Sequence, residues 1–121
     1  MRMWLVPTSI MCRKHLLGEH LEIHMFLGAV KQQRSMTGYI EKNLFEPQAI
    51  YSRHEEIKSE LLLRNYNHNT DLVKSVCQNS ITYLPENHQK YEMNKSLSFN
   101  ELISRCPDCS KLHQNSLGEN I

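Results

Sequence analysis

Hydrophobic positions in the first third of the chain recur with the period of an α-helix. Apolar side chains fall on one helical face at Leu16, Ile23, Leu27 and Val30. An apolar segment also opens the chain, and Pro7 prevents an early helix from running through it. The pattern therefore predicts an N-terminal arm at residues 1–9 and a main helix over residues 10–33.

Two further helices are predicted downstream. A second apolar stripe lies at Ile50, His54, Ile57 and Leu61. Pro47 suits the first turn of the helix that carries it, which we place over residues 47–65. The third helix has the sharpest start signal, the capping box Ser98-Phe99-Asn100-Glu101. Pro107 ends it, so this helix is expected over residues 98–106.

The remaining segments show no clear period. Residues 34–46 have mixed polarity and are expected to form a loop, and the tail at residues 114–121 is expected to fray. The segment 66–96 is longer than ordinary loops, so it is either functional or contains a short element that the pattern does not reveal. Because no alternating strands separate the helices, the predicted fold class is all-α: a small irregular three-helix bundle with long loops.

The bulk composition fits one globular domain over residues 1–121. The chain has 40% apolar and 22% charged residues and a formal charge of +1. No apolar run approaches the roughly 20 residues of a membrane helix, and no signal peptide is recognisable. We therefore expect a cytoplasmic protein without a membrane partner. At this near-neutral charge, nucleic acid would be held by local basic clusters such as Arg13-Lys14 and Lys31 with Arg34.

A second basic cluster lies at the end of the predicted helix 47–65. Arg64 and Tyr66 could contact a phosphate and stack on a base, respectively. The alternative is an ordinary helix end on which Tyr66 is packed.

The leading residue is the first candidate for chemistry. An α-amine has a pKa of about 7.7 to 8 against about 10.4 for lysine, so its nucleophilic fraction at neutral pH is a few hundredfold larger. Arg2 is too large for the initiator residue to be removed, so Met1 is expected to present its own amine. If the arm packs beside the first helix, this amine comes close to a carboxylate, and such a pair suits Schiff-base chemistry. The alternative is a packed terminal segment with a solvated amine.

A polar stripe on the first helix supplies that carboxylate. His15, Glu19 and Glu22 fall within about 60° of one another at 100° per residue, at the edge of the apolar face. Two carboxylates in such a place can divide acid and base roles. The alternative is a solvated stripe with an ordinary His–Glu pair. His20 and His24 have a spacing that permits a shared metal, although the metalloprotease pattern HExxH is absent.

The four cysteines are expected to be reduced thiols, because the compartment is expected to be cytosolic. Cys106 and Cys109 form a CxxC pair, which is half of a zinc site. His113, Cys77 or Cys12 could complete it, so a structural zinc at Cys106 and Cys109 is the alternative. We expect neither a catalytic metal nor a cofactor.

The order of these residues resembles a known family. The arm is followed by His15, Glu19 and Glu22, then by Gly28-Ala29-Val30-Lys31 and later by Arg64-Asn65-Tyr66-Asn67. In this order the chain resembles the phage endonuclease V type of pyrimidine dimer DNA glycosylases, best over the first 33 residues and moderately over residues 47–68. The resemblance implies a mainly α fold whose arm threads between helices. It also implies a monomer that acts on DNA in a bacterial or phage-infected cell.

The resemblance also implies roles for individual residues. Met1 falls on the family's mature first residue, whose amine attacks the sugar, and Glu22 falls on the essential acid. Arg2 matches a basic residue beside the nucleophile, while His15 and Glu19 match positions that flank the site. The implied activity is that of a DNA glycosylase with AP-lyase activity. Its substrate would be duplex DNA with a damaged or modified base or an abasic site, and Lys31, Arg64 and Tyr66 would help to bind it.

Three alternatives stay open at this point. Leu21 and Met25 stand where the family carries arginines that grip the lesion strand, so the same chemistry could serve a different or modified base, or RNA. The chain could instead be a non-catalytic module that binds nucleic acid or protein. It could also be a small zinc-dependent interaction protein built around Cys106 and Cys109.

Overall fold

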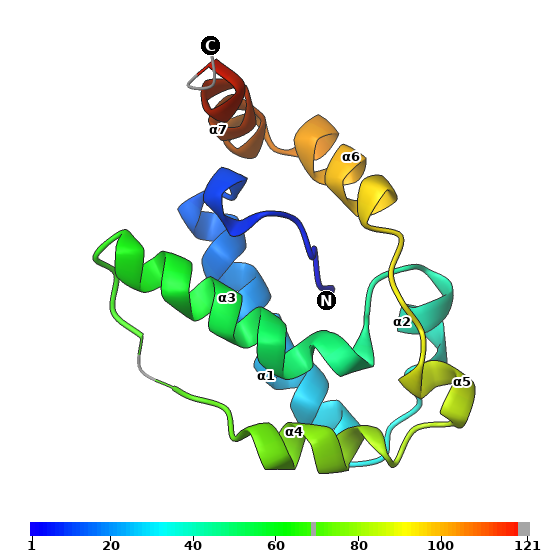
Figure 1. Ribbon diagram of the computed structural model, residues 1–121. Helices are drawn as coiled ribbons and strands as arrows, with labels where there is room; N and C mark the ends of the chain where they lie inside the picture. Colours follow the sequence, from blue (N-terminus) through cyan, green and yellow to red (C-terminus); the bar gives the residue numbers. More distant parts are fainter. Residues whose placement is uncertain (69, 119–121) are drawn as a thin grey trace.

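The fold is entirely helical in the part of the chain that the computed structural model describes, residues 1–68 and 70–118 (Figure 1). No strand occurs in these ranges, which confirms the predicted fold class. The helices are α1 (Arg13–Lys31), α2 (Thr37–Glu41), α3 (Ile50–Leu63), α4 (Lys74–Ile81), α5 (Glu86–Gln89), α6 (Lys95–Arg105) and α7 (Pro107–Gly118), with short 3-10 turns η1 (Thr8–Ile10) and η2 (Pro47–Ala49). None of the helices in these ranges has the length and apolar character needed to cross a bilayer.

The core lies between α1 and α3, which pack along each other. The predicted apolar stripe of α1 is buried, with Leu16, Ile23 and Val30 fully covered. Ile57 and Leu61 of α3 are covered as well. Burying large aliphatic side chains on both helices supplies the main driving force for this pairing.

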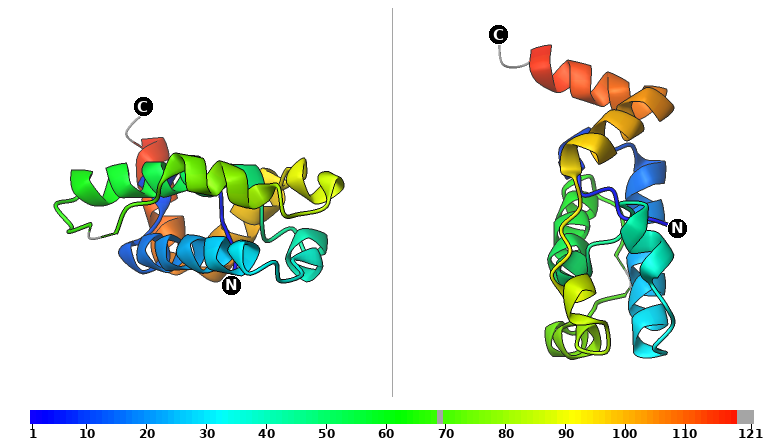
Figure 2. Two further views of the ribbon diagram at one scale, coloured as in Figure 1. Left: turned by 90° about the horizontal axis from the view of Figure 1, so that it is seen from below. Right: turned by 90° about the vertical axis from the view of Figure 1, so that its right-hand side faces the viewer.

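The N-terminal arm runs between the helices, as the resemblance implied (Figures 1 and 2). Met3 donates its backbone N–H to the carbonyl of Leu44 at 2.7 Å, and Ser98 of α6 donates its hydroxyl to the carbonyl of Trp4 at 2.5 Å. Met3, Trp4 and Val6 are buried. The arm is therefore held from both sides, and the first residue is fixed relative to α1 and α6.

Short helices occur in the segments for which the sequence pattern gave no clear period. The segment 66–96 contains α4 and α5, and the loop 34–46 contains α2. These helices have four to eight residues, and α4 buries only Cys77 and Ser80. A stripe of two buried positions in two turns is too short to appear as a helical period.

Several predicted boundaries also differ from the structure. The first helix begins at Arg13 rather than at residue 10, after η1. The helix expected from residue 98 begins at Lys95, because Asn94 caps it by accepting the N–H of Leu97 at 3.1 Å. The hydroxyl of Ser98 is engaged with the arm instead.

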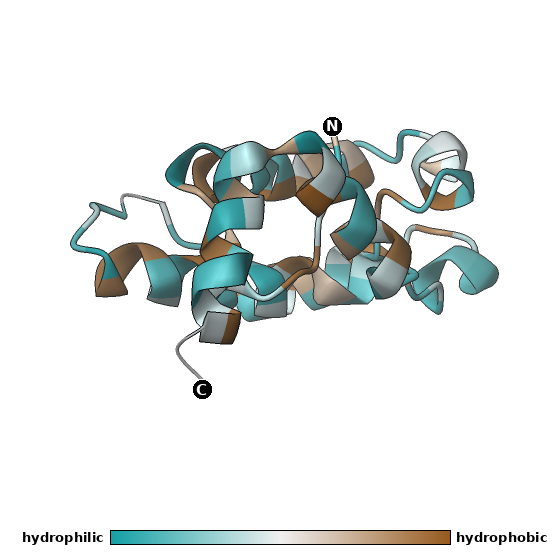
Figure 3. Ribbon diagram, turned by 90° about the horizontal axis from the view of Figure 1, so that it is seen from above, coloured by the Kyte–Doolittle hydropathy of each residue, from teal (hydrophilic) through white to brown (hydrophobic). Residues whose placement is uncertain are grey.

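The end of the chain is more ordered than expected. Residues 114–118 of the tail expected to fray continue α7 to Gly118. The rest of that expectation, residues 119–121, lies outside the described residues. Pro107 does separate two helices, since α6 ends at Arg105 and α7 begins at Pro107. α6 lies beside the arm and α7 lies beside η1 (Figure 2). Figure 3 shows mixed polar and apolar positions on the two helices.

Candidate active site

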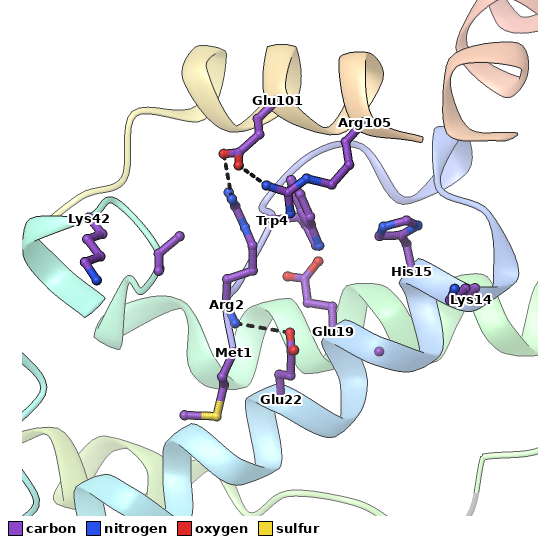
Figure 4. Close-up of a pocket in the computed structure, with 12 residues that line it drawn as sticks. Met1, Arg2, Trp4, Lys14, His15, Glu19, Glu22, Lys42, Glu101 and Arg105 are labelled. Carbon is purple, nitrogen blue, oxygen red and sulfur yellow. Dashed lines mark hydrogen bonds and ion pairs between the residues drawn. The ribbon is translucent and has the colours of Figure 1, made fainter. Parts of the chain in front are cut away.

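The first residues of the chain lie in a cavity of about 660 Å³ between the arm, α1 and α6 (Figure 4). Met1 and Glu22 line it together with cationic and acidic side chains from both helices. This volume is within the usual range of ligand pockets. The cavity joins the leading residue and the polar stripe of α1, which are the two features that the sequence singled out.

Glu22 is connected directly to the start of the arm. The backbone N–H of Arg2 donates a hydrogen bond of 3.2 Å to Oε2 of Glu22. The Met1 amine is one residue earlier, and Figure 4 shows Met1 beside Glu22. No ion pair involves the Met1 amine within the described ranges. The amine is therefore beside a carboxylate with which it forms no direct ion pair in these ranges.

The side chain of Arg2 turns away from the amine and anchors the arm to α6. Its Nη1 donates to Oε2 of Glu101 at 2.7 Å, and its Nη2 donates to the hydroxyl of Ser98 at 2.9 Å. The guanidinium also lies 3.7 Å from the ring centroid of Trp4. With the bond from Nε to the carbonyl of Met3, all three guanidinium nitrogens are engaged within the protein, so the side chain holds the first residue in place.

Glu19 is drawn into the protein interior by a residue far along the chain. Both of its carboxylate oxygens accept from Arg53, at 2.8 and 3.0 Å, and both side chains are almost completely buried. Arg53 also donates to the carbonyl of Val6 at 2.7 Å. Glu19 lines the cavity, but its main contact is this bidentate ion pair between α1 and α3.

His15 lies on the cavity wall near the start of α1. Its Nδ1 is 3.1 Å from Sγ of Cys12, and its ring meets Trp4 edge to face. Burial, followed by the nearby charges of Lys14 and Arg105, lowers the pKa of His15. The imidazole is therefore kept neutral at neutral pH.

Three predicted substrate-binding residues are outside the cavity. Lys31 is exposed at the far end of α1. Arg64 pairs with Glu60 at 2.9 Å and donates to the carbonyl of Thr8. Tyr66 is half-buried and packs against the core. The structure therefore gives Arg64 and Tyr66 local partners and does not bring these three side chains to the leading residue.

Of the other charged residues at the cavity, the sequence analysis named Lys14 in a basic cluster but missed Lys42, Glu101 and Arg105 as site residues. Lys14 and Lys42 are exposed at its rim, and neither forms an ion pair in the described part of the chain. Arg105 pairs with Glu101 on α6. Glu101 and Arg105 are four residues apart on one helix face, which was a recognisable signal, but only the fold reveals that this face borders the arm. Unpaired cations at a rim suit an anionic ligand such as a phosphate backbone.

Among the residues that the structure describes, two groups of side chains have a geometry that could hold a metal ion. Cys12, His15, Cys106 and Cys109 form one group, and His20, His54 and His68 form the other. In the second group the Nε2 atoms of His20 and His68 are 2.9 Å apart, and Nε2 of His54 is 3.1 Å from the carbonyl of Thr70. Nε2 of His68 is also 3.3 Å from Nε2 of His54, so hydrogen bonds link the three rings to one another.

His20 and His24, which the sequence offered as a shared metal pair, do not fall in the same group. His24 is outside both groups, and its buried Nε2 has no hydrogen-bond partner within the described ranges. His113 and Cys77, which the sequence offered as partners for the CxxC pair, are also elsewhere. His113 packs edge to face on Phe99, and Cys77 is buried on α4.

The fold and the cavity together define a candidate site in which the leading residue lies beside the carboxylate of Glu22, with exposed lysines at the rim. A family model described as pyrimidine dimer DNA glycosylase matches residues 1–74. Because this match spans more than half of the 121 residues, the chain belongs to that family. The class of enzyme is therefore a DNA glycosylase, and its partner is DNA. No significant match was found among curated proteins or among solved structures.

Proposed function

We propose that this protein is a DNA glycosylase with AP-lyase activity whose nucleophile is the α-amine of Met1 and whose acid is Glu22. The observation that carries the proposal is the 3.2 Å hydrogen bond from the backbone N–H of Arg2 to Glu22, inside a cavity that Met1 lines. This contact holds a carboxylate next to the leading amine. The family membership supplies the substrate class.

In the first step the neutral amine attacks C1′ of the target sugar. A bond forms between the Met1 nitrogen and C1′ while the bond from C1′ to the base breaks, and the base leaves with the electron pair. The nitrogen then loses a proton and the sugar ring opens, which gives an imine between Met1 and C1′. Loss of a proton from C2′ then expels the 3′ phosphate by β-elimination and cuts the strand.

Glu22 is the group in place to manage charge and protons during these steps. A carboxylate beside C1′ stabilises the positive charge that develops as the base departs. The same group can then carry protons to and from the opened sugar. Arg2 is a positioning residue in this scheme, since it holds the arm through Glu101 and Ser98.

DNA would reach the cavity with its target nucleotide extruded from the duplex, because C1′ inside a stacked duplex is not accessible to an amine. Among the described residues, Lys14 and Lys42 at the rim are the unpaired cations available to the flanking phosphates. His15 and Glu19 complete the wall behind the sugar.

We propose that the protein acts as a monomer in the cytoplasm of a bacterial or phage-infected cell.

Borohydride trapping on DNA with an abasic site tests this mechanism. Reduction should convert the imine to a stable adduct, and peptide mapping should place the DNA on Met1. Protein with an N-terminal extension should give no such adduct, because its original amine is then an amide. Lys14→Arg and Lys42→Arg are matched controls that remove the nearby lysine amines and should trap normally. An adduct on a lysine, or none at all, would refute the proposal.

A second substrate class is favoured by two exposed side chains. Leu21 and Met25 stand where the endonuclease V type of the family carries arginines that grip the lesion strand. Their side chains are 60% and 51% exposed on α1. These apolar side chains offer no charge to a phosphate. We therefore also propose a related activity on a different or modified base, or on RNA. A panel of oligonucleotides, each with one lesion or base and run beside an abasic-site control, separates this activity from cleavage at pyrimidine dimers.

A further inference from the structure

We propose that Cys12, His15, Cys106 and Cys109 bind one structural zinc ion that joins the start of α1 to the junction of α6 and α7. The four side chains offer three sulfurs and one imidazole nitrogen, all within 4.8 Å of one another. This donor set, Cys₃His, is one of the common sets of structural zinc sites. The site is separate from the amine and carboxylate of the proposed glycosylase and does not depend on that activity.

The distances between the ligand atoms fit a tetrahedral ion better than a disulfide. With Zn–S bonds of about 2.3 Å, two sulfurs on one tetrahedron are about 3.8 Å apart. Sγ of Cys12 and Sγ of Cys106 are 3.9 Å apart, and Sγ of Cys109 is 3.8 Å from Nδ1 of His15. A disulfide requires a sulfur separation of about 2.05 Å, which this pair does not approach.

The two halves of the site come from distant parts of the chain with matching local geometry. Cys12 is the N-cap of α1, and His15 follows three residues later on the first turn. Cys106 is the C-cap of α6, and Cys109 follows three residues later on the first turn of α7. A ligand pair three residues apart at the start of a helix directs both side chains to one point. The fold then brings the two points together.

Two of the three sulfurs accept hydrogen bonds from backbone N–H groups, which is an arrangement suited to metal-bound thiolates. The N–H of Cys12 donates to Sγ of Cys109 at 3.2 Å, and the N–H of Cys109 donates to Sγ of Cys106 at 3.4 Å. Such bonds stabilise negative sulfur. Three thiolates and a neutral imidazole around Zn²⁺ carry a net charge of −1. Lys14 and Arg105, whose charges act on His15, are placed to offset it.

Four protein ligands leave no open position, so the proposed ion is structural rather than catalytic. Coordination through Nδ1 of His15 leaves only Nε2 of that ring for the cavity. The ion would also fix the end of α6, the helix on which Glu101 anchors Arg2. Its expected effect on the glycosylase site is therefore indirect, through the position of the arm.

Metal analysis of the untagged full chain, purified with a native start, tests the proposal. Elemental analysis after gel filtration should find one more zinc ion per chain in the wild type than in Cys106→Ser or Cys109→Ser. Cys77→Ser and His113→Ala are the matched controls and should keep the wild-type zinc content. After exchange with Co²⁺, the wild type and both controls should show thiolate-to-cobalt charge transfer and strong tetrahedral bands, which both ligand variants should lack.

A measurement on the wild type covers the case in which the ligand variants do not fold. Titration with a mercurial that reacts with thiols should release the zinc in step with the modification of three cysteines. Zinc absent from the wild type, together with no thiolate-to-cobalt band, would overturn the proposal. So would an equal zinc content in Cys109→Ser and the wild type, or a disulfide that leaves only two titratable thiols under denaturing conditions.

Discussion

The backbone N–H of Arg2 donates a hydrogen bond to Oε2 of Glu22, with 3.2 Å between the two atoms. The donor belongs to the peptide unit that directly follows Met1, so the carboxylate is held beside the leading residue by the backbone itself. A side-chain substitution at position 22 can therefore remove the charge while keeping this contact. Because the charge of Glu22 can be removed without losing this hydrogen bond, the role of Glu22 as the acid can be tested separately from its role in the fold.

Glu22→Gln should abolish most base release while preserving the fold. The glutamine oxygen can still accept the N–H of Arg2, but it cannot stabilise a positive sugar or carry its proton. Removing such a group typically lowers the rate about 10² to 10⁴-fold. Release of free base from a lesion-containing duplex, measured chromatographically, gives the rate. Glu41→Gln, an exposed change on α2, is the control. Near wild-type release by a folded Glu22→Gln protein would exclude Glu22 as the acid.

Arg53→Met should destabilise the protein strongly, because it leaves the carboxylate of Glu19 buried without its partner. Breaking a buried ion pair from one side costs about 3 to 5 kcal/mol. The double variant Arg53→Met with Glu19→Leu should recover much of this loss, though not the bond to the carbonyl of Val6. Urea unfolding measures the free energies, and Arg34→Met on the surface is the control. If the double variant is no more stable than Arg53→Met, the ion pair is not the source of the loss.

Lys42→Ala should weaken DNA binding and reduce its dependence on salt. If the exposed Lys42 side chain neutralises one phosphate, the slope of log K against log salt should fall in magnitude by about 1. Fluorescence anisotropy with a labelled abasic duplex over a range of salt concentrations measures this slope. Lys111→Ala, an exposed lysine on α7 away from the cavity, should leave it unchanged. An equal slope in Lys42→Ala and the wild type would remove Lys42 from the DNA interface.

Acidification should destabilise the fold through the partly buried histidine His20, which lies against the histidines of α3 and of the segment after it. Burial, and then the charges of His54, His24 and His68, lower the pKa of His20 from 6.5 to about 4. The unfolded chain therefore takes up a proton as the pH falls past 6.5, whereas the folded chain takes it up only near pH 4. This contribution to stability is complete above pH 6.5 and is lost between about pH 6.5 and about pH 4.

Urea midpoints at a series of pH values test this acid sensitivity. His20→Gln should flatten the decline between about pH 6.5 and about pH 4 relative to the wild type, since it removes one of the protons that the unfolded chain binds. His113→Gln on α7 is the matched control, and its curve should follow that of the wild type. Identical slopes for His20→Gln and the wild type would show that His20 titrates equally in both states.

The local pattern was sufficient for the helical class and for part of the candidate site. The recurrence of Leu16, Ile23 and Val30 predicted the buried face of α1, and helical geometry placed Glu19 and Glu22 on one side of it. The CxxC pair at Cys106 was recognisable as half of a metal site. Each of these inferences depends on spacing within one segment, which the sequence specifies directly.

Tertiary structure decided how those segments meet. The sequence alone determined that α1 carries a polar stripe, but only the fold turned Glu19 inward to Arg53 and left Glu22 beside the arm. Likewise, only the fold brought Glu101 to Arg2, and Cys106 to Cys12. The physical reason is that residue spacing fixes the face of a helix, whereas the partner of that face depends on burial of the whole core and on contacts between residues up to 99 positions apart.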